Sequence, residues 1–175
     1  GTEVGTSAIE TLTNYVVGFG FDYGAKARGK GDGSEKWAAI VGRIVDEFLE
    51  ANRWESEVER QVFDASRVDG DAFLCLEHRG GACVELRVVD GPQVGEPDRP
   101  RSIEDHCRLS PGLDWKYGIA ADVNRPDRAH AIFVSSLSGD EDWDVYTTDR
   151  FVQLKLNVPT LAKRGLSDFY PIDAT

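Results

Sequence analysis

Apolar residues in the first third of the chain recur at helical spacing. Ile9, Leu12, Tyr15 and Val16 follow three- and four-residue steps, and Ser7 suits the N-cap position before them. We expect Ser34 to cap a second helix. Its apolar residues form one broad stripe: Trp37, Ile40, Val41, Ile44, Val45, Phe48 and Leu49. A third helix is predicted over about 56–68, with Val58, Val62 and Ala65 facing inward.

Glycine and aromatic residues separate the first two helices. Phe19, Phe21 and Tyr23 alternate with smaller residues, which is typical of a strand. The stretch 24–34 is small, polar and glycine-rich, and we expect an exposed loop there. Tryptophan and phenylalanine fit the apolar stripes, so we expect them mainly in the core.

After the third helix the hydrophobic period changes from 3.6 to 2. Residues 72–78 and 83–89 flank Gly80 and Gly81, which favour a hairpin because glycine adopts the positive φ of a tight turn. If these glycines are the two loop residues, His78 lies opposite Cys83 and Cys75 opposite Leu86. One apolar face would then hold Phe73, Cys75, Val84, Leu86 and Val88.

Further alternating segments predict more strands. A second hairpin is expected between 116–122 and 129–137, and short strands over 143–146 and 151–156. Helices first and hairpins afterwards predict an α+β fold, with N-terminal helices packed on a mostly antiparallel sheet. We expect one domain over 1–175. It would have a helical part at about 8–69, a sheet part at about 72–157 and an irregular tail at 158–175.

Composition narrows the class of protein. The chain has 175 residues, enough for one ordinary domain. Its net charge of -11 excludes the broad basic surface of a free-standing DNA binder. No apolar run is long enough for a membrane span, and three cysteines do not form a secreted disulfide framework. Because the chain lacks Met and begins at Gly1, we expect an excised piece of a longer protein.

Residues 24–31 (GAKARGKG) approximate the phosphate-binding loop G-x-x-x-x-G-K-[ST]. That loop needs a hydroxyl ligand for magnesium and an immediate helix N-terminus. Gly31 stands where the hydroxyl residue belongs, and Asp32 adds negative charge beside the phosphate position. A surface loop is therefore the favoured interpretation.

The chain contains two candidate metal sites. Asp140, Asp142 and Asp144 have the spacing of the first ligands of a calcium-binding loop. However, Val145 stands where that loop requires glycine, and Phe151 stands where it requires glutamate. The possible zinc ligands are Cys75, His78, Cys83, His106 and Cys107. Cys75 and His78 point to opposite faces of a strand, which argues against one shared ion. We therefore predict no metal and no cofactor.

No nucleophilic elbow or Ser/Cys–His–carboxylate pattern is present, so the residues predict no enzyme and no catalytic residues. Lys163 and Arg164 form the one basic pair beside a glycine, and they are candidates for DNA or subunit contacts.

Several stretches, in order, resemble the portal (head–tail connector) proteins of tailed bacteriophages and prophages. Residues 14–21 resemble an aliphatic helix running into a glycine-punctuated strand. Residues 67–74 resemble the helix end x-x-G-[DEN]-A-[FY], and 86–94 the strand followed by P-x-x-V. Residues 117–119 and the hairpin after them resemble the family's G-I-x-x-[DN] motif and the second strand of the hairpin that follows it.

The last part of the resemblance is a two-part signature. Residues 149–155 and 163–171 are similar to D-x-[IV]-x-H-x-x followed by R-G-x-S-x-[FL]-x-P, with Gln153 where the family has His. The match extends from about Ile9 to Ile172 and resembles the peripheral wing domain rather than the stem and clip.

The resemblance implies a structural virion protein. Portal subunits form a ring, typically of twelve, at one capsid vertex, where a terminase drives DNA through the ring and the tail attaches. The implied partners are other portal subunits, terminase, capsid and tail-adaptor proteins, and passing DNA, with no membrane. The implied location is the virion, with host cytoplasm during assembly. Lacking the stem, the isolated fragment is expected to be mainly monomeric.

Two alternatives remain open from the sequence. One is a metal- or nucleotide-dependent hydrolase acting through residues 24–31 or the Cys/His set. The other is a stand-alone bacterial binding module with a similar fold but no capsid.

Overall fold

The computed structural model describes residues 3–29, 31–78, 80, 84–96, 112–136, 143–158 and 161–168. Its helices are α1 (Glu3–Val16), α2 (Asp32–Ala51) and α3 (Glu59–Asp69), with short turns at Trp54–Val58, Gly91–Gln93 and Lys116–Gly118. Its strands are β1 (Asp71–His78), β2 (Val84–Asp90), β3 (Leu113–Asp114), β4 (Ile119–Asp122), β5 (Arg125–Ser135), β6 (Trp143–Thr147) and β7 (Phe151–Lys155). The fold is α+β, as predicted.

The strands form two antiparallel sheets. The first has the order β2-β1-β7 and the second β3-β4-β5-β6. Val94 and Val134 form a bridge between the segment after β2 and strand β5. Apolar side chains from both sheets meet in one cluster: Phe73, Cys75, Val89, Val94, Ile119, Ile132, Val134, Tyr146 and Phe151. The main core therefore lies between the sheets.

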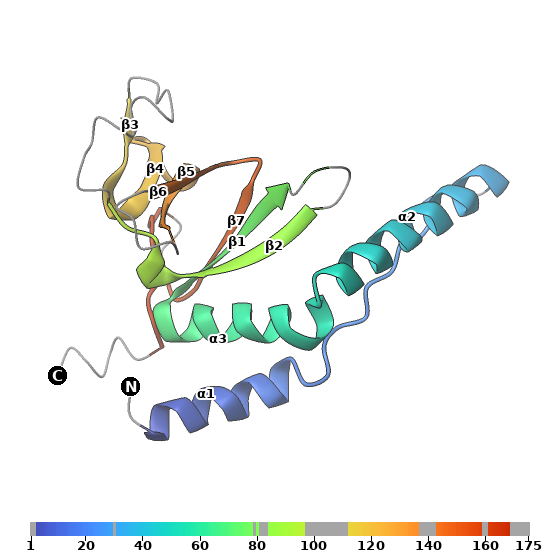
Figure 1. The fold of residues 1–175 in the computed structure, drawn as a ribbon, viewed down its shortest axis with the longest axis horizontal. Helices are drawn as coiled ribbons and strands as arrows, with labels where there is room; N and C mark the ends of the chain where they lie inside the picture. The colour runs from blue at the N-terminus through green and yellow to red at the C-terminus, as the bar shows by residue number, and fades with distance from the viewer. Residues whose placement is uncertain are drawn as a thin grey trace.

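Helices cover the other face of the first sheet (Figure 1). Val58, Val62 and Ala65 pack against Ala72 and Leu74 of β1, as the helical spacing predicted for the three helix residues. Helix α1 lies outside α3 and contributes buried Ile9, and buried Val17 follows directly after the helix. Strand β1 thus has apolar neighbours on both faces, which explains its nearly continuous burial.

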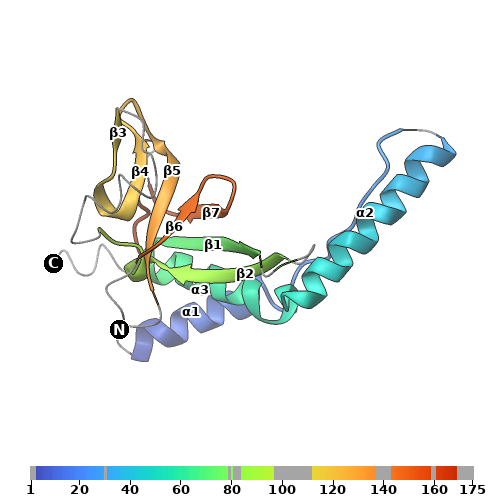
Figure 2. The ribbon, with the colours of Figure 1, turned by 45° about the horizontal axis from the view of Figure 1, so that its top comes forward.

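Helix α2 projects from the body as an arm, which we define as residues 24–51 (Figures 1 and 2). The chain turns sharply after α2, where Arg53 has a left-handed φ of 50°. Asn52 fixes this corner to β2: its Nδ2 donates to the Val84 carbonyl at 3.1 Å, and its Oδ1 accepts from the Leu86 amide at 2.7 Å. The arm therefore starts from a hydrogen-bonded corner.

The predicted helix starts were wrong. Ser7 lies inside α1, where its carbonyl accepts from Thr11, and α2 begins at Asp32 with Gly31 at the N-cap. Ser34 therefore lies within α2 rather than before it. The region 19–23 forms no strand: Gly20 has a φ of +99°, and the Phe21 amide donates to the Glu59 carboxylate at 3.2 Å.

The predicted register of the first hairpin was also wrong. His78 pairs with Val84 and Cys75 with Arg87, one residue away from the expected partners. Because side chains alternate, this step exchanges the faces. Phe73 and Cys75 share their face with Val89, whereas Leu74 shares the helix-facing side with Val88.

The later strands agree with the sequence pattern. Strands β4 and β5 form the expected second hairpin, closed by the two-residue turn at 123–124, and β6 and β7 lie where short strands were predicted. No helix in the described part of the chain combines the length and hydropathy of a bilayer span.

Candidate functional site

Asp71, the first residue of β1, carries a fully buried carboxylate. It accepts hydrogen bonds from Arg164 Nε at 2.5 Å, from the Gly165 amide at 2.8 Å and from Gln153 Nε2 at 3.2 Å. A buried carboxylate is costly unless it is paired and hydrogen-bonded. The three donors meet this requirement.

The remaining guanidinium donors of Arg164 reach three carbonyls in two separate loops. Its Nη2 donates to the Gly91 carbonyl at 2.9 Å, and its Nη1 donates to the carbonyls of Val94 and Tyr117, each at 3.2 Å. The same guanidinium lies over the Phe73 ring, 5.5 Å from the centroid. Arginine suits this position because its planar fork presents several donors in fixed directions.

Lys163 serves the second sheet in the same way. Its Nζ donates to the Asp114 carbonyl at 2.6 Å and to the Ile119 carbonyl at 3.3 Å, and it pairs with the Asp114 carboxylate at 3.2 Å. Its side chain is only 9% exposed. Gln153 also donates to the Lys163 carbonyl at 2.9 Å. The 161–168 segment therefore connects both sheets through two adjacent cations.

Glycine is required where this segment crosses the end of α3. A Cβ on Gly165 would lie 1.7 Å from the Gly70 carbonyl oxygen, and a Cβ on Gly70 would lie 2.4 Å from backbone of Leu166. Gly70 also has a φ of +82°. Beyond the crossing, Arg67 Nη1 pairs with Asp168 Oδ2 at 3.1 Å. We call Asp71, Gln153, Lys163, Arg164 and Gly165 the junction.

The junction holds backbone together rather than presenting free reactive groups. The predicted contact residues Lys163 and Arg164 direct the donors described above to atoms of their own chain. DNA or subunit contact by these two residues stays a prediction, and the geometry gives them an internal structural role. The sequence indicated the pair but not its acceptors, which come from three distant segments, at residue 71, at 91–94 and at 114–119.

Two further buried groups lie between the sheets. Burial raises the pKa of the Cys75 thiol to about 12. Burial, together with donation to Glu77 Oε1 at 2.9 Å, raises the pKa of the Tyr146 hydroxyl to about 12. A nucleophilic cysteine needs its thiolate, so protonated Cys75 behaves as a core residue.

The described residues give little support to either candidate metal site. Cys75 is buried, whereas His78 is exposed at the far end of β1. Cys83, His106, Cys107, Asp140 and Asp142 lie outside the described residues, and Asp144 Oδ2 accepts from Arg87 at 3.3 Å. Among described residues, no group of three or more Cys, His, Asp or Glu is arranged to hold a metal.

The glycine-rich loop lacks the surroundings of a phosphate site. A phosphate-binding loop joins a strand to a helix, whereas the segment before residue 24 is not a strand. Gly24 and Gly31 have open space where a Cβ would lie, so no close backbone approach requires glycine at either position. The exposed-loop interpretation of residues 24–29 agrees with the structure.

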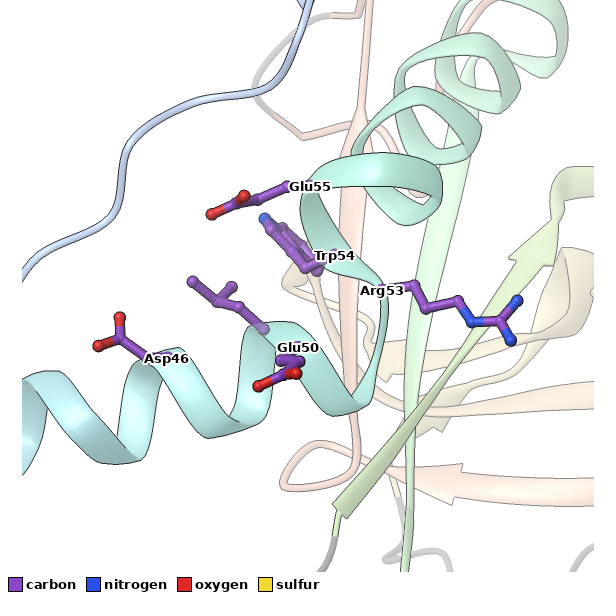
Figure 3. Close-up of a pocket in the computed structure, with 6 residues that line it drawn as sticks. Asp46, Glu50, Arg53, Trp54 and Glu55 are labelled. Atoms are coloured by element: carbon purple, nitrogen blue, oxygen red, sulfur yellow. The ribbon is translucent and has the colours of Figure 1, made fainter.

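An acidic hollow of about 340 Å³ lies where α2 meets the turn at Trp54. Asp46, Glu50 and Glu55 surround the Trp54 indole, while Arg53 points away (Figure 3). The Trp54 Nε1 donates to Glu59 Oε1 at 3.0 Å. The Tyr23 ring meets the Trp54 ring edge to face, with the two ring centroids 6.2 Å apart. Carboxylates beside an indole suit a cationic side chain. No sequence pattern indicates this hollow, because its residues lie on either side of a turn.

In comparisons with known proteins, no family model matches the chain, and no curated protein matches it.

Proposed function

We propose that this chain is the wing domain of a tailed-phage or prophage portal protein and has a structural rather than an enzymatic role. The proposal begins from the ordered resemblance of residues 9–172 to that family. Its strongest structural support is the place where those stretches meet.

Five separated stretches that carry the resemblance contribute atoms to the junction. Asp71 comes from the helix-end motif, Gly91 and Val94 from the strand followed by proline, and Tyr117 from the glycine–isoleucine motif. Gln153 and Arg164 come from the two halves of the last signature. Chance matches scattered along a chain would have no reason to meet around one arginine–aspartate pair. Their convergence supports a common scaffold.

Gln153 is the position at which the chain departs from the family pattern. Its amide bridges Asp71 and the Lys163 carbonyl. A histidine could also donate to a carboxylate there. The departure therefore falls on a structural contact and preserves its donor chemistry.

In the proposed role, the domain forms part of the ring at the capsid vertex and meets other portal subunits, terminase, capsid and tail-adaptor proteins. Its location would be the virion, with host cytoplasm during assembly. An acidic domain is compatible with a channel past which DNA must slide, because strong phosphate binding would hold the DNA in place.

Gene neighbourhood tests this proposal without any assumption about folding. We expect terminase and major capsid genes beside the coding sequence. A neighbourhood of metabolic genes, together with a rise in melting temperature on adding Zn²⁺ or magnesium–ATP, would instead favour the hydrolase alternative, because a ligand bound by the folded state alone stabilises it.

A further inference from the structure

The projecting arm has an uncovered apolar face. Trp37 is 68% exposed and Ile44 is 55% exposed, and Ile40 and Val41 between them are also exposed. At 100° per residue these four side chains fall on one side of α2. We call them the arm stripe. Surfaces of this kind, apolar and contiguous, mark interaction sites in soluble proteins.

The other side of the helix is not equivalent. Ala25 lies 4.0 Å from the position of a Cβ on Gly42, so the segment before α2 packs along the helix on that side. Ala38 and Val45 are correspondingly half-buried. The chain therefore covers one side of its own arm. Residues 25–29 also reach the edge of the stripe, where they line a hollow with Trp37 and Val41, but all four stripe side chains stay exposed.

A second exposed apolar surface lies at the base of the arm. Tyr15 in the last turn of α1, and Phe19 and Phe21 just after it, are exposed. The Phe21 amide is fixed by Glu59, which also accepts from Trp54 of the acidic hollow. We call these three aromatic residues the base patch. Through Glu59, Phe21 of this patch therefore lies near the hollow.

Charge is distributed unequally between the two ends of the arm. Residues 24–36 at the tip contain four cations and two carboxylates, a net charge of +2. Residues 43–57 at the base contain two cations and five carboxylates, a net charge of -3. Lys26 and Arg28 at the tip are exposed. The tip and the base are thus complementary in charge.

One chain cannot bring these surfaces together, because α2 carries the tip away from the base (Figure 2). We propose that the arm of one copy docks on the base of a second copy. The arm stripe would cover the base patch, and Lys26 and Arg28 would face the carboxylates of the acidic hollow. Two different surfaces meet, so the contact is head-to-tail and can continue from copy to copy.

A symmetric pairing of two arms, stripe against stripe, would cover fewer of the exposed apolar side chains. It would cover the stripe on both copies but leave Tyr15, Phe19 and Phe21 uncovered. The proposed contact covers both surfaces. It also departs from the monomer expected of a fragment that lacks the stem. We now expect weak association that grows with concentration.

Sedimentation velocity on the 175-residue chain, from low to several hundred micromolar, tests the contact. The arm variant is Ile40→Glu/Ile44→Glu and the base variant is Phe19→Ser/Phe21→Ser. Because all four side chains are exposed, folding should be retained, and circular dichroism checks this. Ala39→Glu on the opposite side of α2 and Val123→Ser on an exposed turn are matched controls.

The wild-type chain and both controls should associate, and each test variant alone should weaken association about tenfold or more, the equivalent of losing one well-packed contact. An equimolar mixture of arm and base variants should form a 1:1 dimer and nothing larger, because only one intact arm and one intact base remain. Added salt should weaken all complexes.

A wild-type chain that remains monomeric throughout the range would overturn the inference. So would a base variant that associates like wild type, or a mixture no better than the arm variant alone. None of these outcomes bears on the gene neighbourhood, so the docking and the portal proposal can fail separately.

Discussion

Arg164 donates from Nε to Oδ2 of Asp71 at 2.5 Å, and no part of Asp71 is exposed. Arg164 lies 93 residues after Asp71 in the chain. Through this contact and the Gly165 amide, the last described segment reaches the first residue of the central strand. The junction built around it decides how the two sheets lie against each other.

Replacing Arg164 tests how much the junction contributes to the stability of the fold. Arg164→Ala leaves the Asp71 carboxylate buried with two weaker donors, and we expect a loss of about 3 kcal/mol in the free energy of unfolding. Arg164→Lys should recover only part of this, because an ammonium group cannot reproduce the fork. Urea denaturation measures both.

The matched control is Arg125→Ala, which removes an exposed ion pair with Asp127 at 2.9 Å. We expect little or no change in the free energy of unfolding, because solvent screens an exposed pair. Equal losses at the two arginines would contradict the role given to the junction.

Gly165 tests the close crossing beside α3. In Gly165→Ala the new methyl group would collide with the Gly70 carbonyl oxygen, so the backbone must move. We expect a loss of at least about 2 kcal/mol, in the range of overpacked sites. Gly24→Ala, with open space around it, should leave the melting temperature nearly unchanged. A stable Gly165 variant would show that the crossing is looser than described.

Alkaline pH should destabilise the chain through Tyr146. The folded-state pKa is raised to about 12, whereas the hydroxyl in the unfolded chain titrates near its ordinary value of 10.0. The unfolded state therefore releases its proton first, and stability present below pH 10 is lost as pH rises toward 12. Urea denaturation in this window should show a steeper decline for wild type than for Tyr146→Phe. Parallel declines would refute the assignment.

Asn52 tests how the arm is anchored. Asn52→Ala removes two donated hydrogen bonds and one acceptor that serves the Leu86 amide. We expect a loss of about 1–2 kcal/mol and faster hydrogen exchange at Leu86, because that partly buried amide loses its acceptor. Asn124→Ala in an exposed turn is the control, expected within about 0.5 kcal/mol of wild type. Unchanged exchange at Leu86 would mean that the corner is held by other contacts.

Local pattern predicted the elements well. Helical spacing located α2 and the buried face of α3, and alternation located the second hairpin and strands β6 and β7. These features depend on neighbours a few residues away, which is the range that sequence periodicity reports.

Features that depend on distant partners were missed or misplaced. The β1–β2 register differed by one residue because two adjacent glycines do not fix which residues close a connection. Trp37 was assigned to the core because an apolar stripe looks the same whether its partner is the same chain or another. Lys163 and Arg164 were noticed for their charge, but their acceptors are visible only in three dimensions.

Electron microscopy of the gene product that contains this sequence tests the central claim most directly. The portal proposal predicts closed rings around a central channel, with this domain at the periphery. Well-dispersed particles of the complete product that form no ring, alone or with the neighbouring gene products, would contradict it.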